Sequence, residues 1–318
     1  MLLDSVRITG SAVVQIFILG AIGYFLVRKN ILNQDGLGAL SQLVIKVIFP
    51  VLIFSQLISN FSFSNYSDWW VFPLISACIT LFGLLAGSLF LFFIKGKQHR
   101  IQFLSLVTFQ NSGYLPLAMV AAMMPPEQAS TVFIYIFMFL LGFDLIVWSA
   151  GVYMLTFVKN SKFELGSLFS PPVIANLVSL GLIFFGLSKF IPQTVLKPLD
   201  MIGSCTLPLA MFIVGGNIAS IHLRHVDKKA VSLLVLAKLI LMPAVGLGII
   251  MLLKLPALIG LLILMQLAMP PATSLSVIIR HYKKEDLLIS QGIFFGHIFS
   301  LITIPVFLSL YLIFIMVK

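Results

Sequence analysis

Long apolar stretches separated by short polar loops make up most of the chain. Ten of these stretches approach the roughly 20 residues that a helix needs to cross a bilayer. They cover residues 8–27, 37–58, 70–94, 101–124, 129–157, 171–188, 195–219, 230–253, 258–279 and 288–317. The pattern predicts an all-α polytopic membrane protein with ten transmembrane helices.

The fourth and ninth stretches are interrupted near their middles by polar residues, glycine and proline. The fourth reads Thr108-Phe-Gln-Asn-Ser-Gly-Tyr-Leu-Pro116, and the ninth reads Gln266-Leu-Ala-Met-Pro-Pro-Ala-Thr-Ser274. Proline removes a backbone donor and breaks a helix, and lipid cannot satisfy the backbone groups that are freed. Such breaks must be buried in protein or line a wet cavity. Two of them in matching positions predict the binding site of a transporter.

Landmark residues recur at a nearly constant separation along the chain. The pairs are Gly23 and Gly181, Pro50 and Pro208, Pro116 and Pro271, and Gly142 and Gly296, with separations of 158, 158, 155 and 154 residues. Five spans would make up each copy, and because five is odd the second copy would enter the membrane from the opposite side. We therefore expect two inverted repeats, residues 1–158 and 171–318, joined by a cytoplasmic linker at residues 159–170.

Composition and charge support this class of protein. The 318 residues are 60% hydrophobic and 9% charged, whereas soluble domains carry about 25% charged residues. The net charge of +10 does not indicate nucleic-acid binding, because the basic residues lie in short loops between spans. Thirteen Lys and Arg residues lie in the odd-numbered loops and five on the other side, which predicts cytoplasmic odd loops and outward termini.

The polar residues of the two interruptions are the candidate substrate contacts. Unwound segments expose side-chain amides and hydroxyls, and the N-termini of half-helices favour anions. The candidates are Gln110, Asn111, Ser112, Gly113 and Pro116 in the first interruption, and Gln266, Pro270, Pro271, Thr273 and Ser274 in the second.

Charged side chains inside spans are expensive and therefore candidates for ion coupling. Asp144 is the only carboxylate well inside a predicted span, and it could exchange a proton or pair with a lysine. Lys46 is its favoured partner and Lys238 a weaker one, while His297 could relay protons or be a hydrogen-bonded structural residue. For either lysine the alternative is a side chain that reaches the lipid headgroups.

Signatures of enzymes and metal sites were not found in the sequence. It contains no P-loop and no His-Glu-x-x-His motif, so we expect neither an ATP-driven pump nor a zinc enzyme. Cys78 and Cys205 lie inside apolar stretches, which predicts small buried residues rather than a disulfide or metal ligands.

Several stretches resemble the auxin efflux carrier family, in the bacterial branch that includes malate and malonate carriers. They are Phe109-Gln-Asn-Ser-Gly-Tyr-Leu-Pro-Leu117, Pro171-Pro-Val-Ile-Ala-Asn176, Leu207-Pro-Leu-Ala-Met-Phe-Ile-Val-Gly-Gly216 and Ala268-Met-Pro-Pro-Ala272. The resemblance implies a scaffold domain and a transport domain in which helices 4 and 9 cross, as in sodium–bile acid symporters and sodium–proton antiporters. It also implies that Asn111 contacts a carboxylate substrate. The second interruption has no matching asparagine, so the site departs from the plant pattern.

Together these observations predict a secondary transporter that moves a small organic anion across the bacterial inner membrane by alternating access. No cofactor is expected beyond a coupling ion, either H⁺ or Na⁺. A sodium-coupled symporter on the same fold and a channel or sensor are the alternatives. The expected partners are the anion and membrane lipid, without nucleic acid, and the related folds suggest a homodimer.

Overall fold

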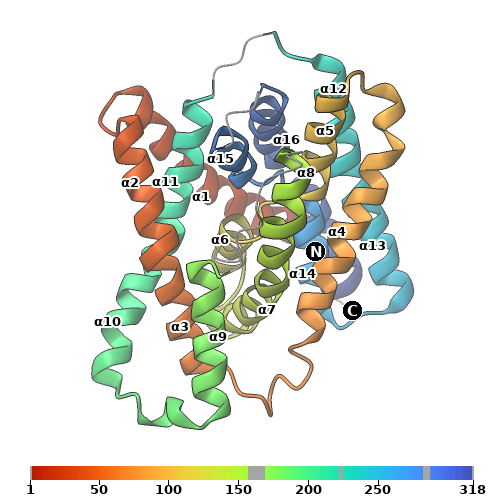
Figure 1. Ribbon diagram of the computed structural model, residues 1–318. Coiled ribbons are helices and arrows are strands. Elements are labelled where there is room, and N and C mark those ends of the chain that lie inside the picture. The colour runs from red at the N-terminus through yellow and green to blue at the C-terminus, as the bar shows by residue number, and fades with distance from the viewer. Residues whose placement is uncertain (1, 157–168, 222–224, 282–286, 317–318) are drawn as a thin grey trace.

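The computed structural model describes residues 2–156, 169–221, 225–281 and 287–316, and these are almost entirely helical (Figure 1). The helices of the first half are α1 Leu2–Arg28, α2 Gln34–Leu43, α3 Phe49–Asn60, α4 Val71–Leu89, α5 Lys97–Thr108, α6 Tyr114–Met123, α7 Pro126–Ile146 and α8 Val152–Thr156. Those of the second half are α9 Pro171–Phe184, α10 Gln193–Ser204, α11 Thr206–Ala219, α12 Lys228–Leu234, α13 Met242–Leu253, α14 Ala257–Ala268, α15 Ser274–His281 and α16 Leu287–Tyr311.

Seven helical segments within the described ranges are long and apolar enough to cross a membrane. They are Leu3–Arg28, Gln34–Asn60, Val71–Leu89, Pro126–Leu155, Gln193–Ala219, Lys228–Leu253 and Leu287–Ile315. The other three predicted spans contain the shorter apolar helices α6, α9 and α14. The chain is thus an all-helical, multi-pass membrane protein, whereas the ten crossings and the inverted repeat stay predictions. Most of the predicted linker, residues 159–168, lies outside the described residues.

Two of the long segments pass through π-helical turns immediately before a proline. Val44–Ile48 precedes Pro50, and Val235–Leu241 precedes Pro243. Proline cannot donate the regular helical hydrogen bond, and a local change of helix geometry lets neighbouring amides take up the freed carbonyls. The helices therefore continue through these prolines as wide turns instead of ending there.

The helices form two groups that meet along α1, α6 and α7. In the first group α1 packs along α11, and α3 packs against α9 and α10. In the second group α4 packs against α5 and α7, while α14 packs against α13 and α16. Figure 1 shows the first group on the left and α4, α5 and α13 on the right. Helix α1 also contacts α6 and α16, so it joins the two groups.

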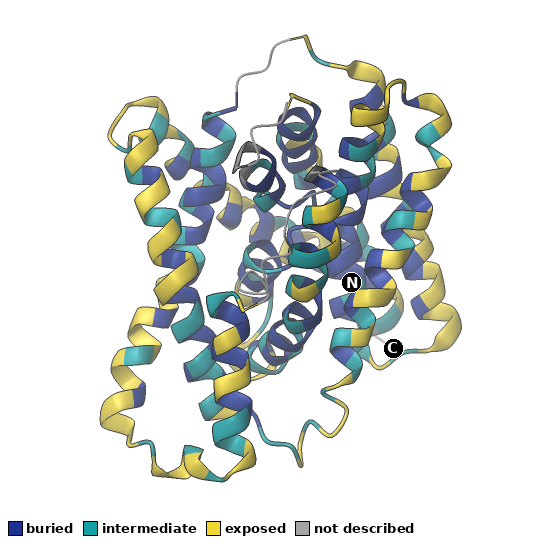
Figure 2. Cartoon of the chain, in the orientation of Figure 1, coloured by how far each residue is buried: buried dark blue, intermediate teal, exposed yellow. Residues whose placement is uncertain are grey.

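The outer faces of the helices are apolar and exposed, as expected for surfaces in contact with lipid (Figure 2). Cys78 and Cys205 belong to these outer faces, because both side chains are exposed. The prediction that they are buried was therefore wrong. An apolar sequence around a residue indicates burial in membrane or in protein alike, so it cannot tell a lipid-facing position from a core position. Both are free thiols, as predicted.

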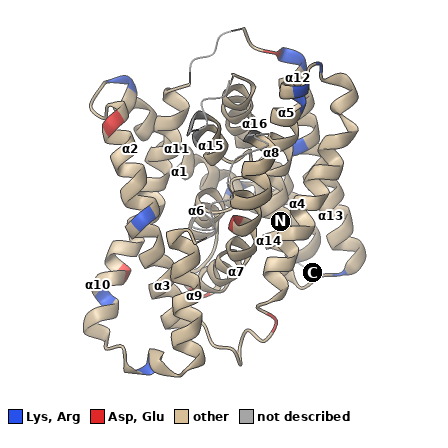
Figure 3. Ribbon diagram, viewed as in Figure 1, with Lys and Arg blue, Asp and Glu red and all other residues tan. Residues whose placement is uncertain are grey.

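Charged residues gather near the ends of the helices. Figure 3 shows blue basic positions near the upper ends of α2 and α12, and few charged positions in the middle of the molecule. This distribution suits a helical bundle whose middle lies in hydrocarbon, because a charge there loses its hydration.

Candidate functional site

Both predicted interruptions are present as non-helical backbone. Helix α5 ends at Thr108 and α6 begins at Tyr114, while α14 ends at Ala268 and α15 begins at Ser274. Gly113 is the N-cap residue of α6 and has φ −105°, a conformation open to other residue types. The first break therefore does not depend on a left-handed glycine.

The two breaks lie against each other and share backbone hydrogen bonds. The backbone amide of Asn111 donates to the carbonyl oxygen of Pro270 at 2.9 Å. The backbone amide of Ala272 donates to the carbonyl oxygen of Phe109, also at 2.9 Å. These bonds pair Gln110 with Pro271 as an isolated antiparallel bridge. Each break thus satisfies part of the backbone that the other frees, which meets the requirement for non-helical chain at membrane depth.

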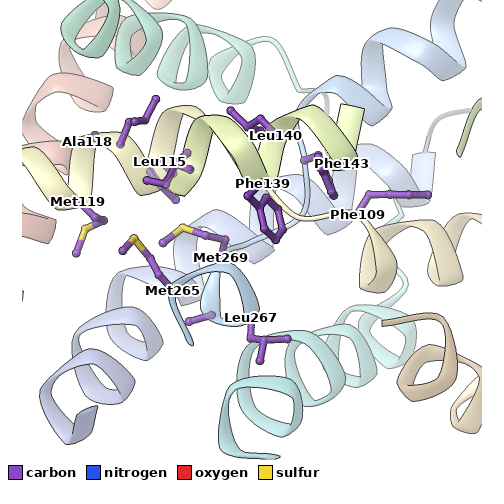
Figure 4. Packing of buried hydrophobic residues seen from close by; sticks show 14 of the residues in the cluster. Phe109, Leu115, Ala118, Met119, Phe139, Leu140, Phe143, Met265, Leu267 and Met269 are labelled. Carbon is purple, nitrogen blue, oxygen red and sulfur yellow. The ribbon is translucent and has the colours of Figure 1, made fainter. Parts of the chain in front are cut away.

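Side chains complete the pairing of the two breaks. The amide nitrogen of Gln266 donates to the carbonyl oxygen of Ser112 at 3.0 Å. The Ser112 hydroxyl donates to the carbonyl oxygen of Gln110 at 3.3 Å. Apolar residues surround the crossing, where the rings of Phe109 and Phe143 lie 6.4 Å apart between centroids (Figure 4).

A cavity of about 170 Å³ lies beside the crossing. Of the ten predicted substrate contacts, six line it: Gln110, Asn111, Ser112, Gly113, Thr273 and Ser274. The other four, Pro116, Gln266, Pro270 and Pro271, do not appear in its lining. The prolines shape the backbone and Gln266 ties the two breaks together, so these four support the site from outside the cavity.

Two of the residues that line this cavity have buried side-chain atoms without a hydrogen-bond partner. Both the nitrogen and the oxygen of the Gln110 amide lack a hydrogen bond, and so does the amide nitrogen of Asn111. Gln110 is fully buried and Asn111 is 6% exposed. A buried polar group left unpaired costs about 1–3 kcal/mol. A ligand that accepts hydrogen bonds would pair with the amide nitrogens of Gln110 and Asn111 and recover their share of this free energy, whereas the Gln110 amide oxygen needs a donor.

The N-termini of two half-helices also face this cavity. Gly113 and Tyr114 at the start of α6 line it, as do Thr273 and Ser274 at the start of α15. The first amides of a helix have no partner within the helix, and the helix dipole is positive at this end. At α15 the backbone amides of Leu275 and Ser276 already donate to the carbonyl oxygens of Ala272 and Thr273, so this end contributes mainly its dipole. The two helix dipoles and the unpaired side-chain amides create an environment suited to an anion.

The predicted coupling residues are separated by the structure. Asp144 lines the cavity, and so does Ser170. Lys46 does not line the cavity; its side chain is exposed and donates to the Gln42 amide oxygen at 3.3 Å. The structure therefore does not bring Lys46 and Asp144 together as an ion pair.

Ten of the residues that line the cavity were not predicted from the sequence, and three of these ten have a polar side-chain atom. These three are Tyr114, Trp148 and Ser170. Tyr114 directly follows the polar run, which was a usable signal. Ser170 precedes the two prolines that open α9, and Trp148 lies in the π-helical turn Val147–Gly151 that follows α7. Such turns are frequent at functional sites, but no pattern in the sequence predicts this one.

The two weaker candidates lie elsewhere. Lys238 is fully buried, with its ammonium 3.8 Å from the sulfur of Met242. His297 lines a second, apolar cavity of about 360 Å³ between α1, α6, α11 and α16. Its Nδ1 lies 2.8 Å from the carbonyl oxygen of Ile293, an ordinary structural bond for a buried histidine. Within the part of the chain that the structure describes, no cluster of metal-ligating side chains occurs.

The fold and the cavity define a helical membrane protein with a polar site between two broken helices, which is the architecture of a solute transporter. Comparison with known proteins agrees with this class. The family model for membrane transport proteins, the auxin efflux carriers, matches residues 9–165 and 154–308. The chain therefore belongs to the auxin efflux carrier family.

Individual relatives carry names of the same kind. An uncharacterized transporter of Methanocaldococcus jannaschii is 29% identical over 209 residues, which cover 63% of this chain and 66% of that protein. An uncharacterized transporter of Methanothermobacter thermautotrophicus is 26% identical over 305 residues, covering 92% and 95%. Protein PIN-LIKES 6 of Arabidopsis thaliana is 26% identical over 124 residues, covering 38% and 29%.

Proposed function

We propose that the protein is a secondary carrier that moves a small organic anion, such as malate or malonate, across the bacterial inner membrane. The observation that supports this most directly is the cavity at the crossing. Two half-helix N-termini and the unpaired amides of Gln110 and Asn111 line one space. A carboxylate accepts hydrogen bonds only, so it matches these donors.

The size of the cavity favours a small substrate. Its volume is about 170 Å³, below the ~300–1,000 Å³ typical of sites for drug-sized molecules. In this proposal Asn111 and Gln110 bind the carboxylate, and Ser112, Thr273 and Ser274 supply hydroxyl groups. The helix ends contribute positive potential without a fixed positive charge.

The proposed mechanism is alternating access, in which one helix group moves against the other around the crossing. The ten crossings, the inverted repeats 1–158 and 171–318 and the outward termini belong to this proposal. So does a homodimer embedded in lipid, as the resemblance suggests. Light scattering of the purified protein measures the oligomeric state, and accessibility of cysteines introduced near each terminus reports the orientation.

Sodium coupling is the second candidate. It would use the carbonyl oxygens freed at the two breaks, Asn111 and the hydroxyls of Thr273 and Ser274. The carbonyl oxygens of Phe109, Gln110, Ser112 and Pro270 each already accept one hydrogen bond, at 2.9 to 3.3 Å. Each of these oxygens therefore has less acceptor capacity left for a cation, which favours the anion site without a sodium ion.

Counterflow in proteoliposomes tests the proposed function. Vesicles loaded with unlabelled mono- or dicarboxylates should accumulate the labelled acid transiently, whereas a channel would give conductance without saturation. Asn111→Ala should weaken the response at least tenfold, because a hydrogen bond to a charged group contributes about 1.5–3 kcal/mol. Asn217→Ala in α11 is the control, since Asn217 does not line the cavity. Full activity of Asn111→Ala would contradict the site assignment.

A further inference from the structure

The cavity at the crossing contains one charged side chain within the described residues, and it is negative. Asp144 lines the cavity, together with neutral polar residues such as Asn111 and Tyr114. No Lys, Arg or His is among the described residues that line it. A substrate anion would therefore enter a space that already holds a carboxyl group and no compensating cation.

Electrostatics makes ionised Asp144 and a bound anion compete. Two unit charges about 5 Å apart, at an effective dielectric constant of about 20, repel enough to weaken binding by about two orders of magnitude. Neutralising Asp144 with one proton removes this repulsion. The carboxyl then offers an O–H donor as well, which a carboxylate substrate can accept.

The helices packed around Asp144 offer no cationic side chain to neutralise its negative charge, so a proton is the remaining way to do so. Helices α3, α9 and α14, which pack against α7, contain no Asp, Glu, His, Lys or Arg. Tyr114 on α6 and the exposed Cys78 on α4 are the titratable groups of the other two packed helices. Lys46 lies in the turn that packs against α9, but its exposed side chain is directed to Gln42.

Ser170 is suited to both protonation states of the carboxyl. Ser170 lines the cavity together with Asp144, and it is the N-cap residue of α9, outside the two breaks. A hydroxyl can donate to a carboxylate and accept from a carboxylic acid. A hydroxyl in the same cavity is therefore a suitable partner for the carboxyl both before and after it takes up a proton.

We propose, on the basis of the proposed function, that the organic anion and one proton on Asp144 occupy this cavity together and are carried as a pair. The carboxylate takes up a proton on the side where the anion binds. It returns the proton to water on the side where the anion leaves. Net movement of the anion then depends on the pH gradient, whereas exchange of anion for anion does not.

The test separates this coupling from the proposed function. Counterflow of labelled malate and malonate first establishes transport by the wild-type protein, and its absence would count against the function itself. Once counterflow is present, accumulation is measured with the outside acidic, and pyranine inside the vesicles reports proton entry. The wild type should accumulate the acid and acidify the lumen only when the acid is supplied.

Asp144→Asn should lower the ratio of gradient-driven accumulation to counterflow at least tenfold. Glu127→Gln is the matched control, because Glu127 is an exposed carboxylate in the first turn of the same helix. If Asp144→Asn does not fold, the wild-type pyranine signal still decides. Counterflow without proton entry, accumulation that requires Na⁺ instead, or an unchanged ratio in Asp144→Asn would overturn the proposal.

Discussion

The backbone amide of Asn111 donates a hydrogen bond to the carbonyl oxygen of Pro270 at 2.9 Å, so the two interrupted helices are joined directly at their breaks. This contact places the Asn111 side chain at the cavity while its backbone is held by the opposite break. The proposed substrate contact and the structural support therefore come from the same short segment. Substitutions in either break are expected to affect both substrate binding and stability.

Gln266→Leu should weaken the crossing without touching the cavity. The substitution removes the bond to the Ser112 carbonyl and leaves this buried acceptor unpaired, a loss of about 1–3 kcal/mol. We expect a lower Tm in detergent and slower counterflow. Gln15→Leu on the exposed face of α1 serves as the control. An unchanged Tm for Gln266→Leu would show that this bond does not hold the breaks together.

Gly296→Ala should displace the second break. A Cβ at this position would lie 2.6 Å from Cδ of Pro271 and 3.3 Å from Cγ, and a proline ring cannot turn aside. Overpacking of this kind costs about 1–3 kcal/mol, and we expect a clear loss of transport. Gly248→Ala in α13 is the matched helical control, because no heavy atom lies within 4 Å of its added Cβ. Equal activity of both variants would contradict this account.

Gly215 and Gly20 should respond unequally to the same substitution. A Cβ on Gly215 would collide with the Gly20 backbone, whereas one on Gly20 meets no atom within 4 Å. The close packing of α11 on α1 therefore depends on Gly215. We expect Gly215→Ala to lower the Tm by several degrees, in line with a cost of about 1–3 kcal/mol, and Gly20→Ala to leave it nearly unchanged. Similar thermal unfolding of the two variants would contradict this contact.

Tyr114→Phe should separate substrate binding from stability. The ring lies edge-on to Phe49 with centroids 5.3 Å apart, and phenylalanine keeps this contact. Only the hydroxyl of this cavity-lining side chain is lost. If it donates to the anion, the half-saturation concentration should rise about 10-fold or more at an unchanged Tm. Tyr135→Phe, on α7 and outside the cavity lining, is the control and should behave as the wild type.

The positions of the two breaks were predictable because each is determined by a short run of consecutive residues. The prolines and the polar run mark where the helices must break, and both breaks lie where the sequence indicated. Which residues of the breaks line the cavity and which only support the backbone was not predictable. Gln110 and Gln266 are both fully buried glutamines beside a break, yet only Gln110 lines the cavity. Which way each side chain points depends on how the half-helices cross.

By itself the sequence determined that this is a helical membrane protein with two broken segments, because hydropathy and proline act locally along the chain. The tertiary structure alone decided that Asn111 meets Pro270, that Asp144 shares the cavity with Ser170, and that Lys46 lies apart from them. These relationships join segments far apart in the sequence. They arise from packing, since each break leaves backbone groups that lipid cannot satisfy and the other break can.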